Sequence, residues 1–293
     1  MSKPFPLNQL SLRRAMGNPK PPQKITQEPF ESDGAHLTRL SSLEPGATAS
    51  SEDLYEYVQD ILYTPIEPEL LRYILPFCLD EWRKELREAK YGHGGMIEYL
   101  YPLLAKPEIF ETHLLPNQTA AVSEFMRSAI LEEIDEQRGL GYRGARVRPH
   151  RWVGALTSYG VLRPDIGTLW NEWWNLSTVG RAIAFFQYIS CLMYSEYENP
   201  IFAPWTPNEG GGPLSVSKFE GHLYKHRWLQ PNLDFLATAL EEAKLADQLQ
   251  RAVRVLEGQP EYPIASEIAE DWPLCADFLR NQCVALLKEL ATQ

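Results

Sequence analysis

The sequence predicts an all-α protein: a single irregular multi-helix domain around a buried central helix, preceded by a proline-rich N-terminal arm. Three observations lead to this prediction. Apolar residues recur at the three- and four-residue spacing of a helix face through most of the chain. Strand-like alternation is confined to residues 214–217, which are too few for a confident strand. One stretch, Ser177–Tyr194, is apolar nearly all round, as a helix buried on every side would be.

The central stretch Ser177–Tyr194 reads as a buried helix rather than a membrane span. Ser177 or Thr178 can cap its first turn by accepting a hydrogen bond from an early backbone N–H. A membrane span needs about 20 apolar residues, whereas Arg181 and Gln187 interrupt this shorter run. We therefore expect other helices around it and no association with a membrane.

Composition sets the broad class of the protein. The chain has 293 residues, of which 44% are hydrophobic, so a sizeable core can form. Its net charge of −11 argues against a general nucleic-acid-binding surface, because such domains are usually basic. The four cysteines form no CxxC pair and sit among apolar residues, which is typical of free thiols in a reducing compartment. No apolar segment flanks Arg13 and Arg14, so no secretory signal is recognised, and we expect a cytoplasmic protein.

Residues 1–49 differ from the rest of the chain. They contain seven of the 23 prolines, six basic and four acidic residues, and no apolar period. We expect an extended or partly disordered arm that lies on the acidic body or contacts a partner. The predicted organisation is thus an arm over residues 1–49 and an all-helical domain over residues 50–293.

Helix signals then follow one another. A helix should begin after Ser50 and the next after Pro68, with Pro76 expected to kink or divide the second. A third should run from Pro116 to Arg138, before a glycine. Later helices are predicted over residues 149–160, 164–174, 218–229, 231–257 (one or two helices) and from 271 to about 290. Aromatic residues gather near the central helix, either as core or as the floor of a ligand pocket.

Residues 64–134 carry a resemblance to known proteins. The two segments concerned are TPIEPELLRYILPFCLDEW and HLLPNQTAAVSEFMRSAILEEI. This pattern resembles uncharacterised helical bacterial proteins of unknown function. The resemblance implies a helical fold and carries no activity with it.

The connector after the third helix is a candidate anion-binding site. It is rich in glycine and holds no acidic residue between Gln137 and Pro164. Arginine forks match carboxylate and phosphate oxygens, and glycines let backbone N–H groups approach an anion. The alternative is that the arginines pair with the acidic residues just before them. The candidate anion-binding residues are Arg143, Arg146, Arg148 and Arg151.

The acidic run at 132–136 is a candidate metal site. Glu132 and Glu136 share a helix face and could hold Mg²⁺ through their carboxylates. Their EExxE spacing is similar to the first motif of all-helical nucleoside-triphosphate pyrophosphohydrolases. That family needs a second acidic pair, ExxD, on a facing helix, and the next thirty residues contain none. The alternative is a solvated helix face.

His222 and His226 form the third candidate. On a helix they project from one face and could share a metal. A zincin would carry Glu beside the first histidine, where this chain has Leu223. The alternative is a pair of partly buried histidines that bond loop carbonyls.

No catalytic set is complete, so no catalytic residue is assigned and the sequence favours a non-enzyme. We expect a binding or interaction protein, whose partner is another protein or a small anionic ligand. The alternatives are a metal-dependent hydrolase using the two histidines with the acidic run, and a structural scaffold for a protein partner. No cofactor is predicted, apart from the divalent metal that the hydrolase would need.

The metal hypothesis predicts a measurable metal content. If His222 and His226 hold a metal, at least one further ligand must come from elsewhere, because a site needs three or four. Protein purified without chelator should then contain close to one equivalent of divalent metal by plasma mass spectrometry, and the His222→Ala variant should lose it. Metal-free protein, or an unchanged content in the variant, would contradict the site.

Overall fold

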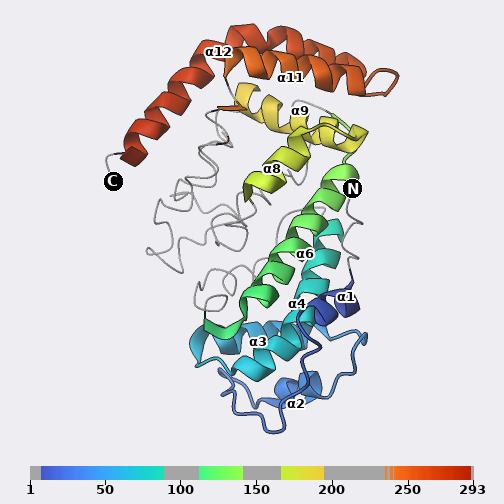
Figure 1. The fold of residues 1–293 in the computed structure, drawn as a ribbon, viewed down its shortest axis with the longest axis vertical. Helices are drawn as coiled ribbons and strands as arrows, with labels where there is room; N and C mark the ends of the chain where they lie inside the picture. Colours follow the sequence, from blue (N-terminus) through green and yellow to red (C-terminus); the bar gives the residue numbers. More distant parts are fainter. Residues whose placement is uncertain are drawn as a thin grey trace. The chain divides into compact units, whose positions relative to one another are not determined.

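The computed structural model describes residues 8–88, 112–140, 166–194, 235, 238–239 and 241–291. Within these ranges every regular element is a helix and no residue lies in a strand (Figure 1). The predicted all-α class is therefore confirmed. None of the helices in the described part has the length and apolar character that crossing a membrane requires.

Contacts within the chain group into two compact units. The first takes in residues 1–129 and 159–162, and the second residues 130–158 and 163–293. Helix α6 (Pro116–Asp135) begins in the first unit and ends in the second. Residues 8–49 belong to the first unit, so the predicted boundary at residue 49 does not coincide with this division. Compact units are not by themselves domains, and the domain organisation stays a prediction.

Helices α3 (Ser51–Tyr63) and α4 (Pro68–Glu88) supply most of the core of the first unit. The Ser50 hydroxyl accepts from the N–H of Asp53 and caps α3 where the sequence indicated. Pro76 does not divide α4, which continues through it as one helix. A proline inside a helix costs about 3 kcal/mol, but the residues on both sides of Pro76 are buried, and their packing outweighs that cost.

The N-terminal segment carries two helices that the sequence did not indicate. Helix α1 (Gln9–Ala15) contacts α4, and helix α2 (Ala35–Ser41) contacts both α3 and α4 (Figure 1). Leu12, Met16, Leu37 and Leu40 are fully or almost fully buried. The expectation of extended backbone is therefore wrong for residues 9–15 and 35–41, which form part of the core of the first unit.

Carboxylates of α3 and of the α3–α4 loop hold the backbone between α1 and α2. Oε2 of Glu67 accepts from the N–H groups of Thr26 and Gln27, at 2.6 and 2.8 Å. Oδ1 of Asp60 accepts from the N–H of Phe30 at 2.6 Å, while its Oδ2 lies 2.6 Å from Nε2 of buried His36. These bonds give the backbone N–H groups of a non-helical segment the hydrogen-bond acceptors that a helix would otherwise supply.

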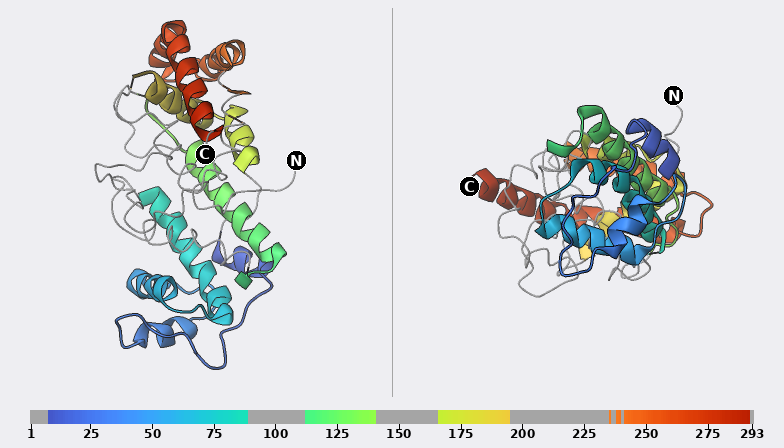
Figure 2. Two further views of the ribbon diagram at one scale, coloured as in Figure 1. Left: turned by 90° about the vertical axis from the view of Figure 1, so that its left-hand side faces the viewer. Right: turned by 90° about the horizontal axis from the view of Figure 1, so that it is seen from below.

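In the second unit, α9 (Val179–Tyr194) is the central helix that the sequence predicted. It contacts α8 (Ile166–Trp174), α11 (Glu242–Val255) and α12 (Tyr262–Ala291). In Figure 1 and in the left view of Figure 2 these helices gather around it. Residues 182–190 are buried, and the Thr178 hydroxyl caps α9 by accepting from the N–H of Arg181 at 3.2 Å.

The aromatic residues near α9 pack against one another. Trp170 stacks on Trp173 with ring centroids 5.2 Å apart, and Trp174 meets Phe185 edge-on at 4.9 Å. All four side chains are buried. The sequence left two interpretations of the aromatic cluster open, core packing and the floor of a ligand pocket. These four residues are part of the core.

The last helix begins earlier than predicted. α12 starts at Tyr262 rather than near Asp271 and runs through Pro273. Its first turns bury Ala265, Ile268 and Trp272 at helical spacing, so tertiary packing extends it beyond the predicted cap. The helix changes direction along its length in Figure 1, as expected of a helix that contains a proline.

The end of α6 and the start of α9 meet at close range. An ideal Cβ on Gly180 would lie 2.0 Å from the carbonyl oxygen of Asp135, so only glycine fits there. The Asp135 carboxylate accepts from Arg181 Nε at 2.8 Å and from the Thr178 hydroxyl at 2.6 Å. The contact is thus fixed by sterics and by charge together.

Two glycines at equivalent helix positions test this contact. Gly180 and Gly167 are each the second residue of their helix, but no described atom lies within 4 Å of a Cβ on Gly167. Gly180→Ala should lower the free energy of unfolding by about 1–3 kcal/mol, as overpacking does. Gly167→Ala should leave it unchanged or raise it by about 0.4–1 kcal/mol. Thermal and urea unfolding compare the variants, and equal effects would contradict the close approach.

Candidate functional site

Most of the site residues predicted from sequence lie outside the described residues. This applies to Arg143, Arg146, Arg148 and Arg151 in the connector and to His222 and His226. The described residues include Glu132 and Glu136, with Glu132 half-buried near the end of α6 and Glu136 exposed just after it. Across the described ranges, no group of three or more His, Cys, Asp or Glu side chains is placed to hold a metal. The metal site stays a prediction.

One carboxylate of the acidic run is already engaged within the second unit. Asp135 forms its ion pair with Arg181 of α9, with 31% of the Asp135 side chain and 14% of the Arg181 side chain exposed. Arg181 also donates from Nη1 to the carbonyl oxygen of Glu172 at 2.6 Å. If the connector arginines pair with the acidic run, their partners are therefore chiefly its other carboxylates, those of Glu132, Glu133 and Glu136.

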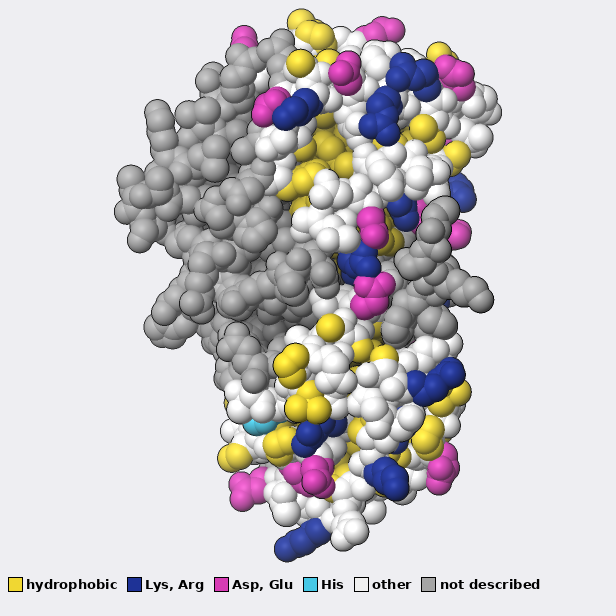
Figure 3. All heavy atoms as spheres, viewed as in Figure 1, with side chains coloured by type: hydrophobic (Ala, Val, Ile, Leu, Met, Phe, Trp, Pro, Cys, Tyr) yellow, Lys and Arg dark blue, Asp and Glu magenta, His cyan; other side chains and the backbone are white. Residues whose placement is uncertain are grey.

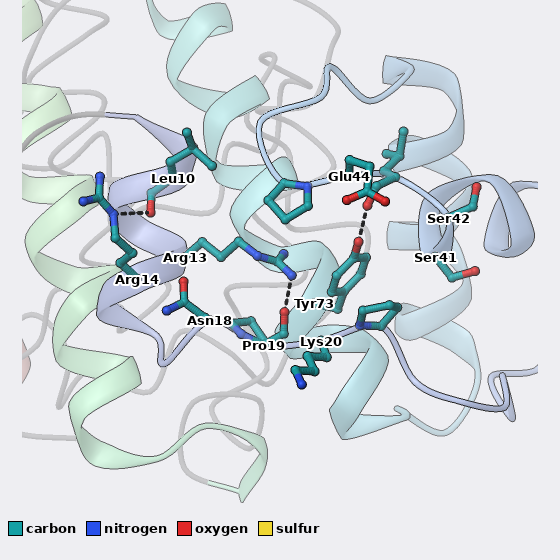
Figure 4. Close-up of a pocket in the computed structure, with 13 residues that line it drawn as sticks. Leu10, Arg13, Arg14, Asn18, Pro19, Lys20, Ser41, Ser42, Glu44 and Tyr73 are labelled. Atoms are coloured by element: carbon teal, nitrogen blue, oxygen red, sulfur yellow. Dashed lines mark hydrogen bonds between the residues drawn. The ribbon is translucent and has the colours of Figure 1, made fainter.

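The first unit contains a pocket that the sequence did not indicate. It has a volume of about 650 Å³ and lies between the end of α1 with residues 18–21, the loop after α2, and Tyr73 of α4 (Figure 4). Three cationic side chains and one carboxylate line it: Arg13, Arg14, Lys20 and Glu44. Figure 3 shows acidic and basic side chains interspersed over the described part of one face.

The end of α1 shapes one wall of the pocket. The N–H of Gly17 donates to the carbonyl of Arg14 at 3.0 Å, and the N–H of Asn18 to that of Arg13 at 2.9 Å. This is the pairing of a Schellman motif, and Gly17 takes the left-handed conformation at φ +86° that the motif requires. The chain therefore reverses sharply after α1 and brings Pro19 and Lys20 beside Arg13.

The opposite wall is held to α1 by one buried side chain. Gln9 accepts from the N–H of Gly46 at 2.6 Å, and its amide nitrogen lies 3.5 Å from the carbonyl oxygen of Ala47. These bonds fix the end of the loop that carries Glu44. The distance between the two walls is thus set by protein contacts before any ligand arrives.

Arg13 is the unusual residue of the pocket. Only 5% of the Arg13 residue is exposed. Its guanidinium carbon lies 4.4 Å from the centroid of the Tyr73 ring, which is a cation–π contact. Nη2 donates to the carbonyl oxygen of Pro19, but Nη1 is buried with no hydrogen-bond partner among the described residues. Burial lowers the pKa of Arg13 from its usual value of 12.5, with opposing contributions from Tyr73 and Glu44. Arginine nevertheless remains charged at neutral pH.

Tyr73 serves as a platform rather than as an acid or base. Its hydroxyl donates to the carbonyl oxygen of Leu43, which ties α4 to the loop after α2 (Figure 4). Burial raises the pKa of Tyr73 above its usual value of 10, although the neighbouring Arg13 opposes that shift. The phenol therefore stays protonated at neutral pH and keeps its ring under the guanidinium.

Sequence reasoning missed the pocket because the proline content of residues 1–49 obscured α1. The signals were nonetheless present: Asn8 caps α1 by accepting from the N–H of Ser11 at 2.9 Å, and Leu12 and Met16 share its buried face. The partner residues at 41–45 and Tyr73 could not be paired with Arg13 without the tertiary structure.

Comparisons with known proteins add no family. No family model, no curated protein and no solved structure matches the chain.

The partner-free nitrogen of Arg13 predicts an unusual stability effect. A buried cation without a carboxylate partner costs desolvation energy, and replacing such groups by apolar side chains is often neutral. Arg13→Met should therefore change the free energy of unfolding by no more than about 1 kcal/mol. Arg181→Met is the matched control, and it should cost about 1.5–3 kcal/mol because it leaves Asp135 without its charged partner.

Urea unfolding of the two variants checks this prediction. A loss for Arg13→Met as large as that for Arg181→Met would show that Arg13 is retained for stability. The stability argument for a binding role of Arg13 would then be withdrawn.

Proposed function

We propose that this protein is a binding protein for a small ligand with an anionic group, which it holds in the pocket between α1, the loop after α2 and Tyr73. The observation that carries the proposal is the guanidinium of Arg13, buried in a pocket wall, whose Nη1 has no acceptor among the residues that the structure describes. A buried polar group without a hydrogen bond costs about 1–3 kcal/mol. A carboxylate or phosphate oxygen from a ligand would supply the missing acceptor.

Charge and size support the same class of ligand. Arg14 and Lys20 are exposed on the same pocket, so the three cations exceed the single carboxylate of Glu44 by two charges. This excess stands against a net charge of −11 for the whole chain. The volume of about 650 Å³ falls within the range of small-molecule sites, roughly 300–1,000 Å³.

The pocket supports binding better than catalysis. The residues that line it include neither histidine nor cysteine, and the Tyr73 hydroxyl is engaged with a backbone carbonyl. General acid–base or nucleophilic chemistry needs a group that can exchange a proton near neutral pH. A binding role agrees with the interpretation of the sequence, although the sequence placed the anion at the arginine connector.

The other expectations remain proposals beside this one. The connector arginines are a second place for an anion, and the metal-dependent hydrolase awaits the metal analysis described above. The cytoplasm remains the proposed compartment, supported by the free thiols of Cys78 and Cys275 in the described part. Burial raises the pKa of Cys78 to about 12, so that thiol is a core residue rather than a nucleophile.

Anion titrations test the proposed function. Inorganic phosphate and acetate should bind the wild-type protein in isothermal calorimetry or ligand-observed NMR. Arg13→Met should weaken the tighter of the two by about tenfold or more, because a hydrogen bond to a charged group is worth about 1.5–3 kcal/mol. Lys20→Gln and Arg14→Gln remove exposed charges and should each weaken binding about two- to fivefold.

Lys24→Gln is the matched control. Lys24 is an exposed lysine four residues from Lys20 and does not line the pocket, so its replacement changes net charge equally and should leave affinity unchanged. Equal weakening by both lysine variants would indicate nonspecific attraction. An absence of binding up to roughly 10 mM of either anion would contradict the proposed function.

A further inference from the structure

The pocket also carries one negative charge, that of the exposed side chain of Glu44. Glu44 lines the pocket, and no described side chain forms an ion pair or hydrogen bond with its carboxylate. Figure 4 shows Glu44 on the side of the loop after α2, whereas Arg14, Arg13 and Lys20 come from α1 and the residues that follow it. Opposite charges thus face one cavity from two walls.

Arg13 and Glu44 do not neutralise each other. The charge of Glu44 is close enough to oppose the lowering of the pKa of Arg13, yet the two side chains form no ion pair. The guanidinium is held on the Tyr73 ring and bonded to the Pro19 carbonyl, which keeps it from turning toward the carboxylate. The walls that carry the two charges are fixed by Gln9 and by the Tyr73 hydroxyl.

We infer that the ligand is a small zwitterion, with an anionic group bound by Arg13 and its neighbouring cations and an ammonium group bound by Glu44. Amino acids and short peptides carry both groups. The inference rests on the proposed function, since it places a second contact in the same pocket. An anion alone would leave Glu44 facing it across the cavity, whereas a zwitterion satisfies both walls.

Three matched compounds separate the two groups of the ligand. Glycylglycine carries both charges, N-acetylglycine carries only the carboxylate, and glycinamide carries only the ammonium. Calorimetry with the intact protein should show that glycylglycine binds about two- to fivefold more tightly than N-acetylglycine, the range expected for an exposed ion pair. Glycinamide should bind most weakly, because it makes no use of Arg13. Glycine in the same series distinguishes a free amino acid from a peptide, according to which of the two zwitterions binds more tightly.

Variants of Glu44 assign the ammonium contact. Glu44→Gln should bring glycylglycine down to the affinity of N-acetylglycine, and should leave N-acetylglycine unchanged or bound more tightly. Glu28→Gln is the control, because Glu28 is also exposed in the N-terminal segment but does not line the pocket. Raising the pH from about 6 to about 9.5 should remove the preference as well, since the α-amino group loses its proton near pH 8.

The outcomes distinguish the two proposals. If N-acetylglycine and glycylglycine bind equally, and Arg13→Met removes both, anion binding stands and the zwitterion inference is overturned. If the preference survives Glu44→Gln, the inference is likewise overturned. If none of the compounds binds although phosphate or acetate does, the zwitterion inference is overturned and anion binding stands. If phosphate and acetate do not bind either, the proposed function itself fails.

Discussion

The architecture of the first unit depends on the hydrogen bonds that the Asp60 carboxylate makes with the segment between α1 and α2 and with α2. The carboxylate is buried, accepts from the N–H of Phe30 and lies against His36 Nε2, and so joins α3 to residues 30 and 36. His36 Nδ1 lies 2.9 Å from Oε2 of Glu56 as well, although it is not aligned for a hydrogen bond. Removing one member of such a buried group is costly, because the others keep their charge or polarity without a partner. These contacts seat the proline-rich segment on the helices of the first unit, while Gln9 and the Tyr73 hydroxyl hold the walls of the pocket.

The position of Arg13 in the pocket reflects a balance between favourable burial of apolar side chains and unfavourable desolvation of its guanidinium. Apolar burial of Leu12 and Met16 fixes α1, and the same helix then has to carry Arg13 into the protein. The Tyr73 ring and the Pro19 carbonyl offset part of the cost of desolvating the guanidinium, but Nη1 has no acceptor within the described part of the chain. A buried polar group without a hydrogen bond is rare in native proteins and calls for an explanation, and an anionic ligand is the explanation we propose.

The sequence predicted those features of the fold that are determined by residues close together in the chain. The apolar character of Ser177–Tyr194 identified the central helix α9, and Ser50 marked the start of α3, because both signals lie within a few residues of the element. The fold of the N-terminal segment escaped prediction because its order comes from partners about 40 residues away, as in the bonds from Thr26 and Gln27 to Glu67. The pocket escaped for the same reason: Arg13 and Tyr73 are 60 positions apart. Its candidate residues therefore come from tertiary contacts and not from a motif.

A crystal structure of the protein with glycylglycine tests the central claim most directly. The account predicts electron density for the dipeptide in the pocket, with its carboxylate within about 2.7–3.2 Å of the Arg13 guanidinium. It also predicts the amino end on the side of Glu44. A pocket that stays empty while the dipeptide occupies another part of the surface would contradict the claim, and so would an Arg13 Nη1 already bonded to a protein acceptor.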